Sequence, residues 1–160
     1  MDWLPKGSSN ITINLMVPDS KEAIEFYKKA FGAEECGIFT IPNTDQVLHA
    51  AISIGETAIY IADSNPEMDM PSPAELGGCP VAICIYTKNP DKLFDQAVAA
   101  GCTIIMPLAD MFWGERTGNL LDPYGYNWAI SSQFEEVSEE EIQKRSEAFF
   151  KENPEMFKKN

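Results

Sequence analysis

The chain has 160 residues, four cysteines and a formal net charge of −13. This length suits one domain that buries its own core, and the negative charge argues against a nucleic-acid partner, because phosphate binding needs a positive surface. The first ten residues, MDWLPKGSSN, lack the basic and apolar regions of a secretory signal, no apolar run approaches the roughly 20 residues of a membrane span, and the cysteines lack metal-binding spacing. We therefore expect a cytoplasmic protein with reduced thiols and no membrane partner.

The first half of the chain reads as a strand, a helix and three strands. Alternating apolar residues over 11–17 predict the first strand. The helix has Asp19 as its expected N-cap, Glu22 as a capping-box partner and Gly32 as its end. The following strands are expected over 35–41, 47–54 and 57–62, the last two joined by Gly55-Glu56.

The second half repeats this order after a linker over 63–79 that is rich in Pro, Met and acidic residues. A strand over 81–86 precedes a helix with Asn89 as its cap, Pro90 at its first position and Gly101 as its end. The remaining strands are expected over 103–106, 112–121 and 127–131. A last helix begins at the capping box of Ser138 and Glu141 and ends before Pro154.

The order βαβββ therefore occurs twice, which indicates an internal duplication. We predict an α+β fold in which two βαβββ modules form a curled mixed sheet around a cavity, with a C-terminal helix appended. The expected organisation is a single domain over 1–134, with modules 11–62 and 80–132 and the linker 63–79, followed by a C-terminal helical extension over 135–160.

Alternation within four strands separates two faces. One face is apolar and is assigned to packing against the helices; it comprises Ile13, Leu15, Val17, Ile59, Ile61, Ile83, Ile85, Trp128 and Ile130. The opposite face mixes small, polar and aromatic residues and comprises Thr12, Asn14, Met16, Ala58, Tyr60, Ala62, Ala82, Cys84, Tyr86, Asn127, Ala129 and Ser131. We interpret this second face as the lining of a cavity; the alternative is a sheet face that meets solvent or a second subunit.

Motifs within this duplicated pattern resemble a known family. They are DSKEAIEFYKKAFGA at 19–33, Leu48-His49-Ala50, Phe112-Trp113-Gly114 and the turn Asp122-Pro123-Tyr124-Gly125. In this order they resemble the vicinal oxygen chelate superfamily, which includes glyoxalase I, the fosfomycin- and bleomycin-resistance proteins and the extradiol dioxygenases, and within it the PhnB-like branch. The resemblance covers residues 11 to about 150.

The resemblance also implies where a metal would bind. In metal-using members of the superfamily, His or Glu ligands lie on the cavity face of the first and last strand of each half. These positions correspond here to Thr12, Tyr60, Ala82 and Ala129. A catalytic divalent cation needs at least two or three His or carboxylate ligands, and His49 is the only histidine. We therefore expect neither a metal nor another cofactor.

Other residues of the cavity face are candidates for binding or catalysis. His49 shares a strand face with Ala51 and Ser53 and is the candidate general base; alternatively it is a structural histidine. Arg116 could hold a carboxylate or phosphate group, or it could pair with Glu115, Asp110 or Asp122. The predicted ligand-binding set is Thr12, Asn14, His49, Tyr60, Cys84, Trp113 and Arg116.

These features favour a metal-free protein that binds a small molecule. One alternative is an enzyme of the lyase, isomerase or dioxygenase type that uses His49 or a metal site not visible in the sequence. Another is a structural or interaction protein with a vestigial cavity. We expect a homodimer, because superfamily members complete the cavity with paired modules within or between chains, and an open curled sheet leaves edges that need cover.

Overall fold

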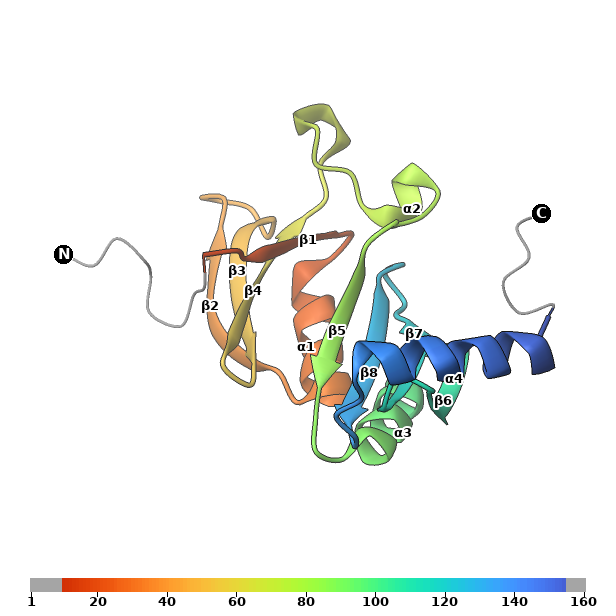
Figure 1. The fold of residues 1–160 in the computed structure, drawn as a ribbon. Coiled ribbons are helices and arrows are strands. Elements are labelled where there is room, and N and C mark those ends of the chain that lie inside the picture. The colour runs from red at the N-terminus through yellow and green to blue at the C-terminus, as the bar shows by residue number, and fades with distance from the viewer. Residues whose placement is uncertain (1–9, 155–160) are drawn as a thin grey trace.

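A computed structural model describes residues 10–154, and its elements repeat in one order (Figure 1). The first module contains β1 (Ile13–Val17), α1 (Ser20–Phe31), β2 (Glu34–Thr40), β3 (Val47–Ile54) and β4 (Thr57–Asp63). The second contains β5 (Ala82–Tyr86), α3 (Pro90–Ala100), β6 (Thr103–Asp110), β7 (Glu115–Leu121) and β8 (Asn127–Gln133). The predicted α+β fold of two βαβββ modules is confirmed.

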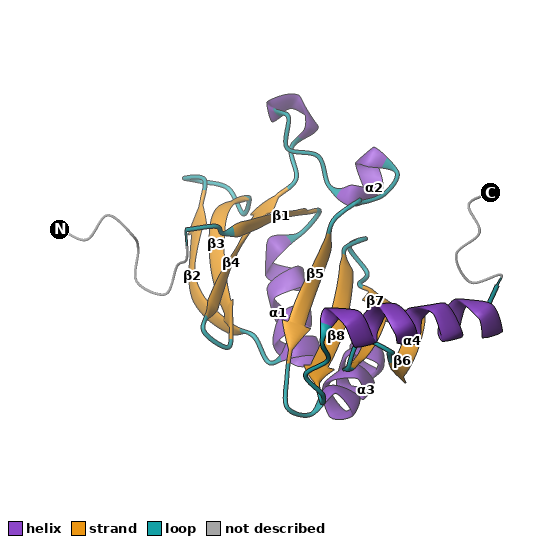
Figure 2. Cartoon of the chain, viewed as in Figure 1, coloured by secondary structure: helices purple, strands orange, loops and turns teal. Residues whose placement is uncertain are grey.

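Each module forms its own four-stranded sheet. The strand orders are β1-β4-β3-β2 in the N-terminal sheet and β5-β8-β7-β6 in the C-terminal sheet. The first strand of each module pairs in parallel with the last one, and the other pairs are antiparallel. The two sheets lie on different sides of α1 (Figure 2), and neither closes on itself.

The remaining helices lie outside the modules. The linker holds a short 3-10 helix, η1 (Pro66–Met68), and α2 (Pro73–Leu76), neither of which the sequence pattern predicts. The predicted C-terminal helix is α4 (Glu139–Glu152), and none of its residues is buried. Within residues 10–154, no helix is both long enough and apolar enough to cross a lipid bilayer.

The helix ends follow the local signals in most respects. Asp19 accepts a hydrogen bond from the Glu22 backbone at 3.0 Å, and Gly32 ends α1 at a φ of 69°. At α3, Pro90 occupies the first turn as predicted, but the Asn89 side chain makes no capping hydrogen bond. The expected strand over 112–121 begins only at Glu115, because the three residues before it form a turn.

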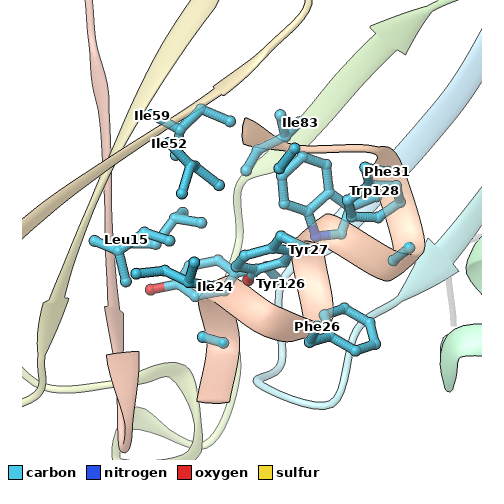
Figure 3. Close-up of a cluster of buried hydrophobic side chains, with 14 of the residues drawn as sticks. Leu15, Ile24, Phe26, Tyr27, Phe31, Ile52, Ile59, Ile83, Tyr126 and Trp128 are labelled. Carbon is cyan, nitrogen blue, oxygen red and sulfur yellow. The ribbon is translucent and has the colours of Figure 1, made fainter. Parts of the chain in front are cut away.

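The core lies between the helices and the inner faces of both sheets. The predicted apolar face is confirmed, since Leu15, Val17, Ile61, Trp128 and Ile130 are at most 1% exposed. Tyr27 of α1 packs against Trp128 of β8 with ring centroids 5.5 Å apart (Figure 3). Burying a large apolar side chain contributes roughly 1.5–3 kcal/mol, so this shared core fixes the two modules against each other.

A buried carboxylate strengthens the junction between the modules. Asp122, in the turn between β7 and β8, is 3% exposed. Its Oδ2 accepts hydrogen bonds from the Tyr27 hydroxyl and the Trp128 indole, each at 2.8 Å. Its Oδ1 accepts the backbone N–H groups of Tyr124 and Tyr126, each at 2.9 Å. Burial raises the pKa of Asp122, and these hydrogen bonds oppose that shift.

Candidate functional site

The face of each sheet that is turned away from α1 and α3 is here called its open face. On the open face of the N-terminal sheet, the rings of His49 and Tyr60 meet edge to face at 4.6 Å, and Phe39 stacks on His49 at 6.3 Å. Asn14 lies beside Tyr60 in the strand register, and Thr12 immediately precedes β1. Four of the predicted site residues thus lie on, or directly before, the three adjacent strands β1, β4 and β3.

The imidazole of His49 lies between two aromatic rings. Its ring makes the two aromatic contacts just described, and within residues 10–154 no side chain forms a hydrogen bond with it. The arrangement can hold an apolar or aromatic body of a ligand, because the rings of Phe39, His49 and Tyr60 form a continuous aromatic surface.

The open face of the C-terminal sheet carries hydrogen-bonded polar groups. The Tyr86 hydroxyl donates to Glu115 Oε1 at 2.8 Å, and the Trp113 indole donates to Glu115 Oε2 at 3.0 Å. The bond to Glu115 raises the pKa of Tyr86 to about 12. Farther along the face, the thiol of Cys84 donates to Ser131 Oγ at 3.5 Å, which also shares a hydrogen bond of 2.7 Å with Thr117.

The positions predicted to correspond to the superfamily's metal ligands lie on or next to strands of these open faces, but their side chains do not fit a metal. Ala82 and Ala129 offer no donor atom, and Thr12 and Tyr60 offer only hydroxyls. Within residues 10–154 there is no group of three or more His, Cys, Asp or Glu side chains that could hold a metal ion. The donor set therefore disagrees with the chelate chemistry of the superfamily.

Arg116 does not lie on an open face, which corrects its predicted place in the cavity. Because Glu115 and Thr117 point to the open face, the residue between them points toward α3. There Arg116 binds Asp91 through two nitrogens, at 2.6 and 3.0 Å, and Asp110 at 2.8 Å. Of the carboxylates considered as structural partners, only Asp110 pairs with it, and sequence reasoning missed Asp91.

The structure also divides the predicted ligand-binding set. Thr12, Asn14, His49 and Tyr60 belong to the N-terminal sheet, whereas Cys84 and Trp113 belong to the second module. Within the described part of the chain, no strand of one sheet pairs with a strand of the other. The predicted set is therefore divided between the two modules.

A cavity of about 530 Å³ lies between the two sheets, where β5 faces β4 and the turn before it. Its lining is mainly apolar and includes Ile13, Ile59, Ile83, Ile85 and Trp128. Of the predicted ligand-binding residues, only Cys84 contributes to this lining. The cavity thus adjoins the open face of the C-terminal sheet and leaves the aromatic group of His49 outside.

Sequence reasoning missed Glu115 as a residue of the site. A signal for it was present, because Glu115, Thr117 and Asn119 alternate in phase and pair with β8 residues of the open face, Asn119 with Ala129 among them.

Comparisons with known proteins agree with this architecture. The profile of the Glyoxalase/Bleomycin resistance protein/Dioxygenase superfamily matches residues 11–130. An uncharacterized protein of Mycobacterium bovis is 37% identical over 134 residues, which cover 81% of this chain and 87% of that protein.

Solved structures extend the comparison to three dimensions. Protein PA1353 of Pseudomonas aeruginosa has a TM-score of 0.62 at 23% identity, covering 78% of this chain and 98% of that one. TnmS3, an antibiotic binding protein from Streptomyces sp. CB03234, has a TM-score of 0.59 at 16% identity, covering 78% of this chain and 96% of that one. At these identities the structures establish a shared fold.

Proposed function

Because the chain belongs to the glyoxalase/bleomycin resistance protein/dioxygenase superfamily, we propose that it binds a small organic molecule on its open faces without using a metal ion. The observation that carries this proposal is that residues without metal-binding side chains stand at the predicted ligand positions on those faces. Alanines stand at 82 and 129, and the surroundings offer aromatic rings and a few oriented polar groups instead. Such a combination is typical of sites for small organic molecules.

The similarity to TnmS3 supports the same proposal. That protein is described as antibiotic binding and has the same fold. We further propose that the chain belongs to the PhnB-like branch, because its motifs over 19–33 and 122–125 occur in the order typical of that branch. We also propose that it works in the cytoplasm. Cys36, Cys79, Cys84 and Cys102 are all free thiols, which is consistent with a reducing compartment.

We propose that the complete site requires a homodimer. Phe39 on one open face and Tyr86 on the other are 66% and 63% exposed, and exposed apolar surface of this kind marks interaction sites. If the open face of an N-terminal sheet meets the open face of the partner's C-terminal sheet, the aromatic and polar groups line one cavity. Sedimentation at micromolar concentration should then give twice the 17.8 kDa mass of the chain; a monomer would contradict this arrangement.

Native mass spectrometry of the freshly purified protein tests the binding function. We expect a small organic molecule retained from the expression host, and we expect Tyr60→Ala to lose it because its ring contacts the central His49 ring. The matched control is Leu48→Ala, since Leu48 is exposed but lies on the neighbouring position of β3. The proposal fails if no molecule is retained and none of a fragment library binds.

A metal-independent enzyme is the second candidate, and the position of His49 on an open face favours it. His49→Gln separates the two possibilities, because it removes the only histidine while keeping a polar side chain of similar reach. A binding protein should retain its ligand in this variant to within about threefold. Turnover of the identified ligand that disappears in His49→Gln would establish the enzyme instead.

A further inference from the structure

We infer that Glu115 binds a cationic group of the ligand, so that the ligand class is an organic ammonium or amidinium compound with an apolar body. This inference rests on the proposed small-molecule function and adds the chemistry of the ligand to it. It rests on the hydrogen-bond partners of Glu115, which are neutral, whereas nearby carboxylates pair with arginine.

Nearby carboxylates are neutralised by arginine. Asp91 and Asp110 share Arg116, and Glu135 and Glu141 share Arg145, at distances of 2.6 to 2.9 Å. Glu115 has only the neutral donors of Tyr86 and Trp113, and within residues 10–154 no Lys, Arg or His forms an ion pair with it. Among the described residues, its negative charge is therefore not neutralised by a cationic side chain.

The carboxylate still has capacity to accept hydrogen bonds. An ionised carboxylate has about four lone-pair sites on its two oxygens. One aromatic donor occupies each oxygen of Glu115, which leaves at least one site per oxygen. An ammonium or amidinium group can fill these sites with charge-assisted hydrogen bonds, which are stronger than neutral ones.

Aromatic rings adjoin the same carboxylate. The rings of Tyr86 and Trp113 are held beside Glu115 by their own hydrogen bonds to it, and Phe112 meets Trp113 edge to face at 4.9 Å. Aromatic faces attract cations through their quadrupole. A ligand whose cation binds Glu115 therefore has ring surface beside it for its apolar part.

The backbone holds this group rigidly. Gly114 adopts a φ of 90°, and a Cβ atom there would lie within about 2.4 Å of the Glu135 carbonyl oxygen. The same glycine accepts hydrogen bonds from the backbone of Phe134 and Glu135 at 3.0 and 3.1 Å. The segment after β8 thus clamps the turn between Trp113 and Glu115, so both side chains are preorganised before a ligand arrives.

The charge of the whole chain acts in the same direction. A formal net charge of −13 raises the local concentration of cations and accelerates their encounter with the surface. It does not select Glu115, but it makes a cationic ligand the electrostatically favoured class and predicts that binding weakens as salt is added.

Titration of the full-length protein with matched probes tests the inference. The probes are 2-phenylethylammonium, the neutral 2-phenylethanol and the anionic 3-phenylpropionate, and the signal is the indole N–H resonance of Trp113. We expect the ammonium probe to bind about tenfold more tightly than the alcohol, which corresponds to about 1.4 kcal/mol, and the anion to bind most weakly.

Glu115→Gln should lower the affinity for the ammonium probe about tenfold and change the affinity for the alcohol less than twofold. The substitution removes the charge of the side chain and keeps its shape. The matched control is Glu147→Gln on the exposed side of α4, which changes net charge equally and should change neither affinity. Glu115→Lys should reverse the preference toward the anion.

The outcomes separate this inference from the proposed function. Equal binding of ammonium and alcohol, or an unchanged ammonium affinity in Glu115→Gln, overturns the cationic class and leaves small-molecule binding standing. The inference also fails if none of the probes binds. The proposed function fails only if, in addition, the protein retains no molecule and binds no fragment.

Discussion

The open face of the N-terminal sheet carries a stacked aromatic group, whereas the open face of the C-terminal sheet carries a hydrogen-bonded network around one carboxylate. The helix-facing sides of the same two sheets are alike, since both are filled with buried aliphatic and aromatic residues. The inner sides must fit the packed pair α1 and α3, so their character is constrained in both modules. The open faces do not pack against this pair of helices, and they are therefore where the two modules can hold different chemistry.

Removing the Asp122 carboxylate should have the largest effect on the shared inner side. Asp122→Ala leaves the Tyr27 hydroxyl and the Trp128 indole buried without an acceptor, and each unsatisfied group costs about 1–3 kcal/mol. We expect the free energy of unfolding in urea to fall by about 3–5 kcal/mol. The control Asp110→Ala, at an exposed ion pair with Arg116, should cost less than about 1 kcal/mol. Equal losses in the two variants would show that Asp122 does not join the modules.

Enlarging a small strand residue should separate inner from open faces. Ala50 on β3 is completely buried, so Ala50→Leu overpacks the core and should cost about 1–3 kcal/mol. Ala129 is partly exposed on the open face, so Ala129→Leu should cost less than about 0.5 kcal/mol while it blocks ligand binding. A loss of several degrees in the Tm of Ala129→Leu would instead place that residue in a packed core.

Acid should loosen α4 before it affects the junction at Asp122. Arg145 lowers the pKa of Glu135, so this ion pair stabilises the attachment of α4 above the unfolded-state pKa, about 4.3 for Glu, and is lost as the pH falls through the lower folded-state value. Burial raises the pKa of Asp122, so this carboxyl group binds a proton more readily in the folded state than in the unfolded state. Protonation of Asp122 on acidification therefore does not favour unfolding.

The ring contact between Phe112 and Phe149, with centroids 5.2 Å apart, reports on this attachment. We expect its nuclear Overhauser signal to weaken as the pH falls below about 4.3 while contacts of Tyr27 with Trp128 persist. Arg145→Ala should weaken the signal already at pH 7 and remove its dependence on acid. A signal that survives to pH 3 in the unsubstituted protein would contradict a role for Glu135.

The smallest expected effect concerns the polar network of the C-terminal sheet. Glu115 raises the pKa of Tyr86 to about 12 through their hydrogen bond, so Glu115→Gln should lower that pKa toward the usual value near 10. Titration of the ring carbon signals of tyrosine by NMR measures it, and Tyr124, whose pKa is raised to about 12 mainly by burial, is the internal control. Unchanged titration of Tyr86 would show that the bond is absent in solution.

The architecture could be predicted from the sequence because its signals are local. Alternation in strands and the residues at helix ends, such as Asp19 and Gly32, act within a few positions of where they stand. The start of β7 was misplaced because Phe112 and Trp113 are apolar, as strand residues are, whereas the turn depends on Gly114 and its distant contact with Glu135.

The site was harder to predict because it depends on how elements pack. The packing of β7 against α3 turns Arg116 toward Asp91 and leaves Glu115 on the open side. Similarly, alternation predicted that His49 and Cys84 point away from the helices, as they do. It could not show that these two open faces belong to separate sheets. The separation of the sheets is set by tertiary packing around α1, which no short stretch of sequence encodes.

Elemental analysis of the dialysed protein, before and after exposure to Ni²⁺ or Zn²⁺, tests the proposal of a metal-free site most directly. The side chains at 12, 60, 82 and 129 provide no set of ligands, so we expect fewer than about one ion in ten chains and no change in the affinity of a bound organic molecule when metal is added. One tightly held divalent ion per chain, with ligand binding that depends on it, would contradict the account.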